Sequence, residues 1–536
     1  ANAQALEDLK GGAEGLQLVF RGALGAYGTA LAGDGDAALA QLFDKVRIEW
    51  GLPIALEYSS LAPQAAEGLA RLVQSRHIEP SITQVLFGLD PLGAALRFGF
   101  GSETFASQAK SFGEKAKRLA SLGFKQGVVA ADSRLVHAAG GTEAQELGYA
   151  LAAGVAYLRA LTDAGLGLDE ARRLILFRLA VDADEFASVA KLRALRRLWA
   201  KVEESCGLAP EPALIHAETA WRMMSASDPW SNLLRVTVAV FSAAVGGADA
   251  VAALPFTQAL GAPDAFARRL SRDTQLVLQD ESYLHVVDDP TAGAGGFEAL
   301  TEALAERGWD AFRTIEAEGG LPKALEAGRF PAEVVEIAKG RAAAVARAKE
   351  KITGSNEFPD IAERPLSVLA PFDACSGGEA KADPKTLLPS RLSEPFEALR
   401  RCSDAQLAQT GARPRVFLAT LGPVAAFTAR ANFSKNFFEA GGVEAVFGPT
   451  SDNTSEIVAA FRASGAKLAC LCSSDAIYCD AAKSAALALR GAGATLYLAG
   501  RPGDLEAELR QVGVERFIFA GCDMLPMLQR AIEEAT

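Results

Sequence analysis

The sequence predicts an α/β protein in which a TIM-type (β/α) barrel is followed by a flavodoxin-like doubly wound domain. Short apolar runs alternate with long Ala-, Leu- and Arg-rich stretches through the first part, and this alternation resumes near residue 415. The 536 residues suffice for one large barrel and a smaller domain. We therefore expect the barrel at residues 1–350, an extended linker at 351–413 and the second domain at 414–536.

Seven runs in the first part have the length and composition of buried parallel strands. They lie at residues 16–20, 54–58, 83–89, 127–131, 174–181, 213–216 and 251–256. A closed (β/α) barrel needs eight strands, and the chain opens in helix-like sequence at residues 5–10. We therefore expect that the first strand of the barrel is missing from this chain or comes from a segment that the pattern does not reveal.

The stretch between the two parts loses this periodicity. Prolines interrupt it at positions 359, 365, 371, 384, 389 and 395, and each one fixes φ and removes a backbone donor. The stretch is therefore predicted to be a long, extended connector.

The last part contains five further strand-like runs separated by amphipathic stretches. They lie at residues 416–420, 443–448, 467–472, 495–500 and 516–520. One helix is expected to begin at Asn453, where Glu456 completes a capping box, and to stop near Gly465. Five strands separated by helices predict a small doubly wound domain.

The composition limits the possible classes of function. Lys and Arg number 54 against 66 Asp and Glu, and a formal charge of −12 gives no field for a polyphosphate backbone. The most apolar region, residues 236–256, is broken by Gly246, Gly247 and Asp249, so no membrane span is predicted. The charged start lacks the apolar core of a secretion signal, and seven scattered cysteines indicate reduced thiols. We expect a cytoplasmic protein that binds neither nucleic acid nor membrane.

The four histidines offer one candidate site residue. They stand at positions 77, 137, 216 and 285, too far apart in sequence for a paired metal motif. His137 follows the predicted strand at 127–131 and precedes a glycine pair, which places it on the face of a barrel where active sites lie. The alternative, a histidine that is hydrogen-bonded within a loop, is the more frequent case.

Three cysteines near the end of the chain form the second candidate. Cys470 and Cys472 are alternate residues of a predicted strand, so both thiols could face one ion, and Cys479 follows shortly afterwards. Free cysteine is also a common small core residue, and we favour that interpretation. No phosphate-binding loop, nucleophile elbow or dinucleotide fingerprint is present in the sequence. The residues by themselves therefore predict an architecture without a chemistry.

Several collinear motifs carry a resemblance to a known family. Residues 186–196, 228–235, 245–249, 255–260, 272–274, 287–290 and 352–359 contribute, and the match continues at 454–457 and 471–474. Residues 228–235, for example, read Asp-Pro-Trp-Ser-Asn-Leu-Leu-Arg. These motifs resemble the adenosylcobalamin-dependent acyl-CoA mutases, in particular methylmalonyl-CoA mutase. The resemblance implies a barrel that holds the acyl-CoA, a linker around it and a C-terminal cobalamin-binding domain.

The chain departs from the catalytic members of that family at their cobalt ligand. Those members carry Asp-x-His-x-x-Gly just after the first strand of the last domain, and the His replaces the lower base on cobalt. Here Thr420 is followed by Leu-Gly-Pro-Val-Ala-Ala-Phe-Thr, and no histidine occurs after His285. Four phenylalanines are expected to fill, as core, the groove that the cofactor's tail would need. They are Phe427, Phe433, Phe437 and Phe438.

A second departure concerns the substrate. The resemblance implies a histidine beside the thioester, in the loop after the strand at 127–131. Alignment on Gly140-Gly141-Thr142 puts Leu135 at that position, and His137 falls two residues later. A leucine cannot donate the hydrogen bond that would polarise a thioester carbonyl.

These joint losses resemble the small, or β, subunits of heterodimeric methylmalonyl-CoA mutases, which are non-catalytic paralogues of the large subunits. The resemblance implies an isomerase subunit that supports a catalytic partner converting methylmalonyl-CoA to succinyl-CoA. Adenosylcobalamin and acyl-CoA are expected on that partner, and no catalytic, cofactor-binding or metal-ligating residue is expected here. Two alternatives remain open: an active mutase component that uses cobalamin supplied by another chain, and a free-standing acyl-CoA-binding or regulatory protein. Leu135 argues against the first, and a stable monomer would favour the second.

Overall fold

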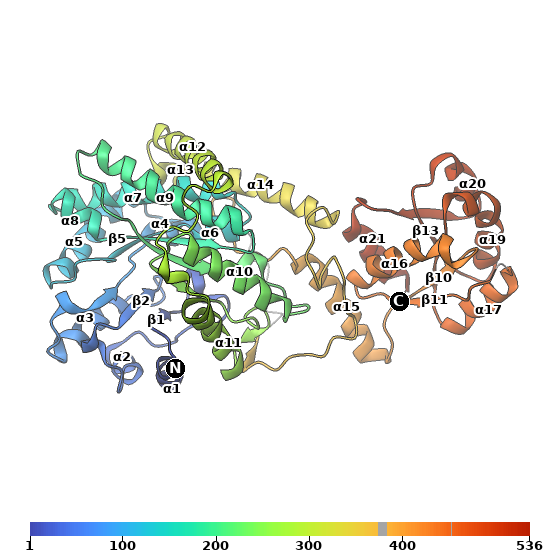
Figure 1. Cartoon of the computed structure of the whole chain (residues 1–536), viewed down its shortest axis with the longest axis horizontal. Helices are drawn as coiled ribbons and strands as arrows, with labels where there is room; N and C mark the ends of the chain where they lie inside the picture. Colours follow the sequence, from blue (N-terminus) through green and yellow to red (C-terminus); the bar gives the residue numbers. More distant parts are fainter. Residues whose placement is uncertain (373–382, 452, 536) are drawn as a thin grey trace. The chain divides into compact units, whose positions relative to one another are not determined.

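The computed structural model describes residues 1–372, 383–451 and 453–535 (Figure 1). The chain divides into two compact units, and each unit consists of three segments that alternate with those of the other along the sequence. The first comprises Ala1–Met224, Asn232–Ala338 and Leu366–Arg391, and the second comprises Ser225–Ser231, Lys339–Pro365 and Leu392–Thr536. The predicted boundaries at residues 350 and 414 stay predictions.

The first unit contains all seven predicted strands, and every pair of neighbours is parallel. They are β1 (Leu16–Val19), β2 (Pro53–Glu57), β3 (Gln84–Leu86), β4 (Val129–Asp132), β5 (Ile175–Val181), β6 (Leu214–Thr219) and β7 (Ala250–Ala252). The strands form two sheets in sequence order, β1-β2-β3 and β4-β5-β6-β7. A parallel bridge between Leu89 and Val129 joins the end of the first sheet to the start of the second. The predicted mixed α/β architecture with parallel sheets is confirmed.

Helices precede, connect and follow these strands, and at least one helix lies between each pair of consecutive strands, as expected for parallel pairs. They are α1 (Asn2–Lys10), α2 (Asp36–Leu42), α3 (Ala65–Ser75), α4 (Pro91–Phe98), α5 (Phe105–Ser121), α6 (Arg134–Ala138), α7 (Glu143–Asp163), α8 (Leu168–Arg173), α9 (Glu185–Ser205), α10 (Ser231–Val245), α11 (Ala265–Leu276), α12 (Gly295–Ala317), α13 (Leu321–Ala327) and α14 (Arg329–Ala346). Helices α7, α9 and α12 lie side by side outside β5 (Figure 1). Helix α7 begins with a reciprocal capping box between Thr142 and Gln145. A Cβ at Gly154 would lie 2.9 Å from Trp199, so glycine permits the close approach of α7 and α9.

The two ends of this strand array stay unpaired with one another. Among the described residues, β1 and β7 are sheet edges, and no hydrogen bond joins them. Leu31 bridges the outer edge of β1 near its end, where its N–H donates to the carbonyl of Val19 at 2.8 Å. A short antiparallel pair, β8 (Gly261–Ala262) and β9 (Ala370–Pro371), lies further along the chain.

The second unit contains the five strands predicted for the last part of the chain. They are β10 (Arg415–Thr420), β11 (Glu444–Phe447), β12 (Leu468–Cys472), β13 (Thr495–Ala499) and β14 (Val514–Ile518). The sheet is parallel, in the order β11-β10-β12-β13-β14, which is the strand order of flavodoxin-like doubly wound domains. Its helices are α15 (Glu394–Thr410), α16 (Val424–Ala440), α17 (Thr454–Ser464), α18 (Asp475–Ile477), α19 (Lys483–Gly491), α20 (Glu506–Gln511) and α21 (Met524–Ala535).

Two local predictions need correction. Helix α17 begins after Asn453 and ends at Gly465, as expected, but Glu456 accepts from the Ser451 hydroxyl and the Asn453 side-chain amide instead of closing a capping box. The predicted linker is not extended at residues 394–410, because Pro395 lies in the first turn of α15, where a missing N–H costs nothing. Residues 373–382 of that linker lie outside the described residues.

Alternation along the strands of the second unit sorts its core onto two faces. Val416, Leu418, Cys470 and Cys472 pack on one face, and Phe417, Ala419, Ala469 and Leu471 pack on the other. All eight side chains are buried, as the continuous apolar runs predict for a sheet covered on both faces. In the part of the chain that the structure describes, no helix has both the length and the apolarity to cross a membrane.

Candidate functional site

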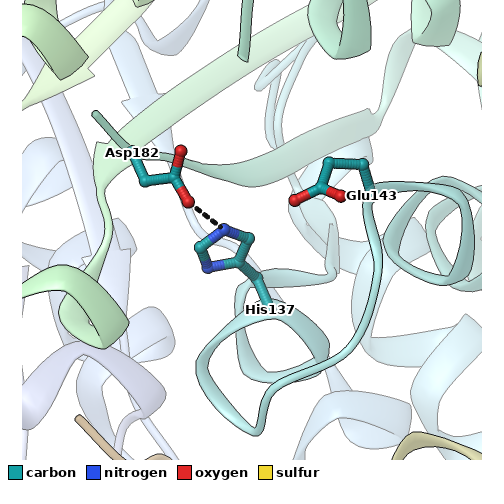
Figure 2. Close-up of side chains that lie close together, drawn as sticks. All are labelled: His137, Glu143 and Asp182. Atoms are coloured by element: carbon teal, nitrogen blue, oxygen red, sulfur yellow. Dashed lines mark hydrogen bonds and ion pairs between the residues drawn. The ribbon is translucent and has the colours of Figure 1, made fainter. Parts of the chain in front are cut away.

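Polar side chains gather where β4, β5 and β6 end, at the edge of the sheet where parallel α/β proteins place their sites. His137 lies in α6 and Glu143 begins α7, both in the connection after β4, and Asp182 directly follows β5, so two neighbouring connections bring these residues together (Figure 2). Arg222 joins them from the short 3-10 helix Trp221–Met223 after β6. His137 therefore lies beyond the carboxyl end of β4.

His137 and Arg222 share one carboxylate. Nε2 of His137 lies 3.1 Å from Oδ2 of Asp182 (Figure 2), and the Arg222 guanidinium donates to the same oxygen at 2.9 Å. Arg222 also donates to the carbonyl of Gly141 at 3.0 Å. His137 is 1% exposed, and its Nδ1 has no partner among the described residues. The imidazole is thus held inside the loops.

The charge states follow from these contacts. Burial lowers the pKa of His137, and the neighbouring cations Arg222 and Lys191 lower it further. Burial opposes ionisation of Asp182, but the hydrogen bond from His137 and the charge of Arg222 hold the pKa of that carboxyl well below its ordinary value. The imidazole is therefore neutral near pH 7, and the ionised carboxylate fixes the proton on Nε2.

The Arg222 guanidinium already supplies a positive charge to this cluster. Ligand atoms of His137, Glu143 and Asp182 lie within 4.8 Å of one another, a spacing that could hold a metal ion. The Arg222 guanidinium lies 3.4 Å from Glu143 as well as 2.9 Å from Asp182, so it occupies the centre of the carboxylate pair. A divalent ion there would meet this positive charge at close range. The geometry therefore favours a hydrogen-bonded, ion-paired loop, the alternative interpretation of His137.

Leu135, the residue aligned with the substrate histidine, lies one half-turn before His137 in α6. It is buried in the main hydrophobic core of the first unit. It contributes packing and no hydrogen-bond donor at this edge of the sheet.

A second polar cluster was not predicted from the sequence. Arg134, the first residue of α6, contacts three carboxylates from three strands: Glu57 of β2 at 2.8 Å, Asp132 of β4 at 2.9 Å and Glu218 of β6 at 2.6 Å. All four side chains are almost completely buried. The available signal was an acidic residue within or just after each of three predicted apolar strands, where a solvated carboxylate is out of place.

The pKa values of Glu57 and Glu218 in this second cluster are shifted in opposite directions. Burial opposes ionisation of Glu57, but Arg134 and Arg178 lower its pKa below the ordinary value. Burial raises the pKa of Glu218 to about 7, Arg134 opposes that rise, and the negative charges of Glu57 and Asp132 add to it. The cluster therefore holds a proton on Glu218 at mildly acidic pH.

Aromatic side chains lie over this cluster. Tyr27 stacks on Trp221 with ring centroids 4.5 Å apart, and its hydroxyl donates to Glu218 at 3.1 Å. The guanidinium of Arg391 lies 5.3 Å from the Trp221 ring centroid. A cavity of about 20 Å³ remains beside Glu57, Asp132 and neighbouring residues, room for a single water molecule. The protein's own side chains thus fill this part of the site.

In the second unit, the loop after β10 is tied to its neighbour. The Leu421 carbonyl accepts from the Ser473 hydroxyl at 2.7 Å, and the Leu421 N–H donates to the carbonyl of Cys472 at 3.1 Å. The four phenylalanines of α16 belong to the core on that side of the sheet, three of them buried and Phe433 partly so. Their predicted role as core residues is confirmed.

The three cysteines do not converge. Cys470 and Cys472 are fully buried, and the Ser434 hydroxyl lies 3.7 and 3.4 Å from their sulfur atoms. Cys479 is exposed, on the short π-helix Tyr478–Ala482. Burial raises the pKa of the Cys470 thiol, so it is a poor thiolate ligand. The core interpretation of the buried pair is supported.

Comparisons with known proteins agree on one family. The family model described as Methylmalonyl-CoA mutase matches residues 125–383. A methylmalonyl-CoA mutase small subunit of Streptomyces virginiae is 42% identical over 537 residues, 99% of this chain and 82% of the relative. The small subunit of Propionibacterium freudenreichii subsp. shermanii is 36% identical, covering 88% of this chain and 72% of the relative.

Likeness to a protein named simply methylmalonyl-CoA mutase is more restricted. The Rhizobium meliloti protein is 36% identical over 236 residues, 43% of this chain and 33% of the relative. The two small subunits therefore match 99% and 88% of this chain, about twice the share that this mutase matches. The chain belongs to the methylmalonyl-CoA mutase family, and within it to the small subunits.

Proposed function

We propose that this chain is the non-catalytic subunit of a heterodimeric methylmalonyl-CoA mutase. In this proposal the seven parallel strands of the first unit belong to a (β/α) barrel, and a homologous large subunit carries out the isomerisation. The single observation that carries the proposal is the buried contact of Arg134 with Glu57, Asp132 and Glu218. This contact lies at the carboxyl ends of the strands, where a barrel enzyme would hold its substrate. The protein's own side chains therefore occupy the place that a substrate would need.

Leu135 and His137 also support the proposal, because neither side chain can donate a hydrogen bond to a thioester carbonyl. Leu135 itself has no donor, and the Nε2 proton of His137 is engaged by Asp182 at 3.1 Å. A catalytic donor must be able to reach a carbonyl oxygen as charge develops on it. Neither side chain meets that requirement.

The second unit does not fit adenosylcobalamin bound through a protein imidazole. The loop after β10 offers only Leu421, Gly422 and Pro423 before α16, and Leu421 is tied by hydrogen bonds to the loop after β12. The phenylalanines of α16 fill the adjoining space as core. We therefore place the cobalamin, together with the acyl-CoA, on the partner subunit, and we derive no step through the cofactor on this chain.

Reconstitution tests the proposal. Purified residues 1–536 and the catalytic large subunit of the same source are assayed for methylmalonyl-CoA isomerisation singly and mixed, and the mixture is examined by sedimentation. We expect no turnover by this chain alone and a one-to-one complex in the mixture. Turnover by this chain alone, a stoichiometric spectral shift when it is titrated with adenosylcobalamin, or a monomer that ignores the large subunit would each overturn the proposal.

A further inference from the structure

A cavity of about 290 Å³ lies at the amino ends of β4, β5 and β6, the edge of the sheet opposite to His137 and Arg134. Its walls come from the turn before β4, the end of α8, one side of α9 and the start of β6. These segments meet because the three strands are parallel and paired in sequence order. The volume is at the lower end of the range for small-molecule sites, so the cavity suits a compact ligand and not a coenzyme.

The buried part of the cavity wall is apolar. Ile175 of β5, Trp199 of α9 and Ala213 line the cavity, and all three side chains are buried. The Trp199 ring packs edge-on against Phe177, with ring centroids 4.8 Å apart, so this part of the wall is fixed. A ligand that fills the cavity therefore needs an apolar body.

The two carboxylates of the cavity wall already have partners. Glu203 accepts from Nη1 of Arg172 at 3.3 Å and from the Glu211 N–H at 2.9 Å. The Glu211 carboxylate accepts from Arg173 at 3.0 and 2.8 Å and lies 2.8 Å from Nη2 of Arg172. Both arginines also contact Asp169, at 2.5 and 2.8 Å. Among the described lining residues, a cationic ligand would thus meet only carboxylates that are already paired.

The groups of the wall that lack a partner are mainly hydrogen-bond donors. Lys125 and Gln126, in the turn before β4, make no side-chain hydrogen bond or ion pair with any residue that the structure describes. Nε of Arg172 is buried and also lacks an acceptor among them, although that side chain belongs to the wall and is 93% buried. A buried N–H without an acceptor is costly. An ammonium and a guanidinium N–H together call for an acceptor that carries negative charge.

We propose that this cavity binds a small organic monocarboxylate. Its carboxylate lies between Lys125 and Gln126 and supplies the acceptor that Nε of Arg172 lacks, and its apolar body packs against Ile175 and Trp199. A single negative charge matches Lys125, the one lining cation without a counter-ion among the described residues. The inference goes beyond the proposed function, because the cavity belongs to this chain alone and lies away from the carboxyl ends of the strands.

Calorimetric titration of the purified chain with four probes tests the inference: butyrate, hexanoate, hexan-1-ol and inorganic phosphate. Each buried methylene should tighten binding about fourfold, so we expect hexanoate to bind about 15-fold more tightly than butyrate. Hexan-1-ol should bind at least about tenfold more weakly than hexanoate, and phosphate should not saturate the site. Hexan-1-ol binding as tightly as hexanoate, phosphate binding as tightly as hexanoate, or no saturable binding of either acid would each overturn the inference. None of these results bears on the proposed function.

Variants at exposed lysines locate the site. Lys125→Met removes the lining charge and keeps the length of the side chain, Lys125→Arg keeps the charge, and Lys201→Met changes an exposed lysine of α9 outside the cavity wall. We expect K125M to weaken hexanoate binding at least about tenfold, and K125R and K201M to change it less than about threefold. Equal affinities of K125M and K201M for hexanoate, with both variants folded by circular dichroism, would place the binding elsewhere and overturn the inference.

Discussion

Nη1 of Arg134 lies 2.6 Å from Oε2 of Glu218, and the two side chains are 3% and 6% exposed. The residues are 84 positions apart. Their contact draws α6 onto the strands, because Arg134 is the first residue of that helix and Glu218 lies within β6. A buried charge pair of this kind is costly to break even when it is not a large net source of stability.

Removing the guanidinium tests this relationship. Arg134→Leu leaves three buried carboxylates without their common partner, so we expect the free energy of unfolding to fall by about 3–5 kcal/mol. Urea unfolding followed by tryptophan fluorescence measures it, because four of the five tryptophans lie in the first unit. Arg197→Leu is the control: its partner is Glu302, both side chains are about half exposed, and the expected loss is under about 1 kcal/mol. Equal losses of unfolding free energy in the two variants would show that the buried cluster contributes no more to stability than the exposed ion pair.

The stability of the protein should depend on the proton of Glu218. Its folded pKa of about 7 lies above the unfolded value, so the folded state binds more protons between about pH 4.5 and 7. The contribution of this group to stability is present below the unfolded pKa and is lost as pH rises through 7. The glutamine of Glu218→Gln does not titrate, so only the parent loses stability as the pH rises. We therefore expect the unfolding free energy of the variant minus that of the parent to increase between pH 5 and 8, by about 3 kcal/mol at most. Parallel pH profiles for the two proteins would contradict the assignment.

His137 should matter for folding and not for turnover. His137→Ala removes the neutral donor to Asp182 and opens a buried space, so we expect a loss of about 2–3 kcal/mol in unfolding free energy. The turnover of each reconstituted complex should stay unchanged at a temperature where the variant is folded. His77→Asn, at an exposed position, is the control for both measurements. A selective loss of turnover with stability intact would return His137 to the catalytic machinery.

The buried thiols should respond to packing and not to chelators. We expect the double variant C470A/C472A to lose about 1–2 kcal/mol of stability through lost contacts in the core. Dialysis against a chelator should leave the melting temperature of the parent unchanged. Stoichiometric zinc in the purified parent that disappears from the double variant would contradict the core interpretation.

The strands were predictable because each one is a local pattern. The strands β1 to β7 of the first unit and all five of the second coincide within a few residues with apolar runs bounded by breakers, whereas the short pair β8 and β9 was not predicted. The loop after β10 was readable for the same reason: whether it contains an imidazole is a matter of which residues follow Thr420. The interpretation of the chain as a small subunit depended on such local losses, and the comparisons agree with it.

Only the tertiary structure decided which polar residues meet. Glu57, Asp132 and Glu218 are single acidic residues in separate runs, and no spacing along the chain relates them to Arg134. They converge because parallel strands in sequence order carry them to the same edge of the array, where Arg134 begins its helix. The sequence alone therefore determined the elements and the missing cobalt ligand, whereas the register and order of the strands decided which charges are buried together.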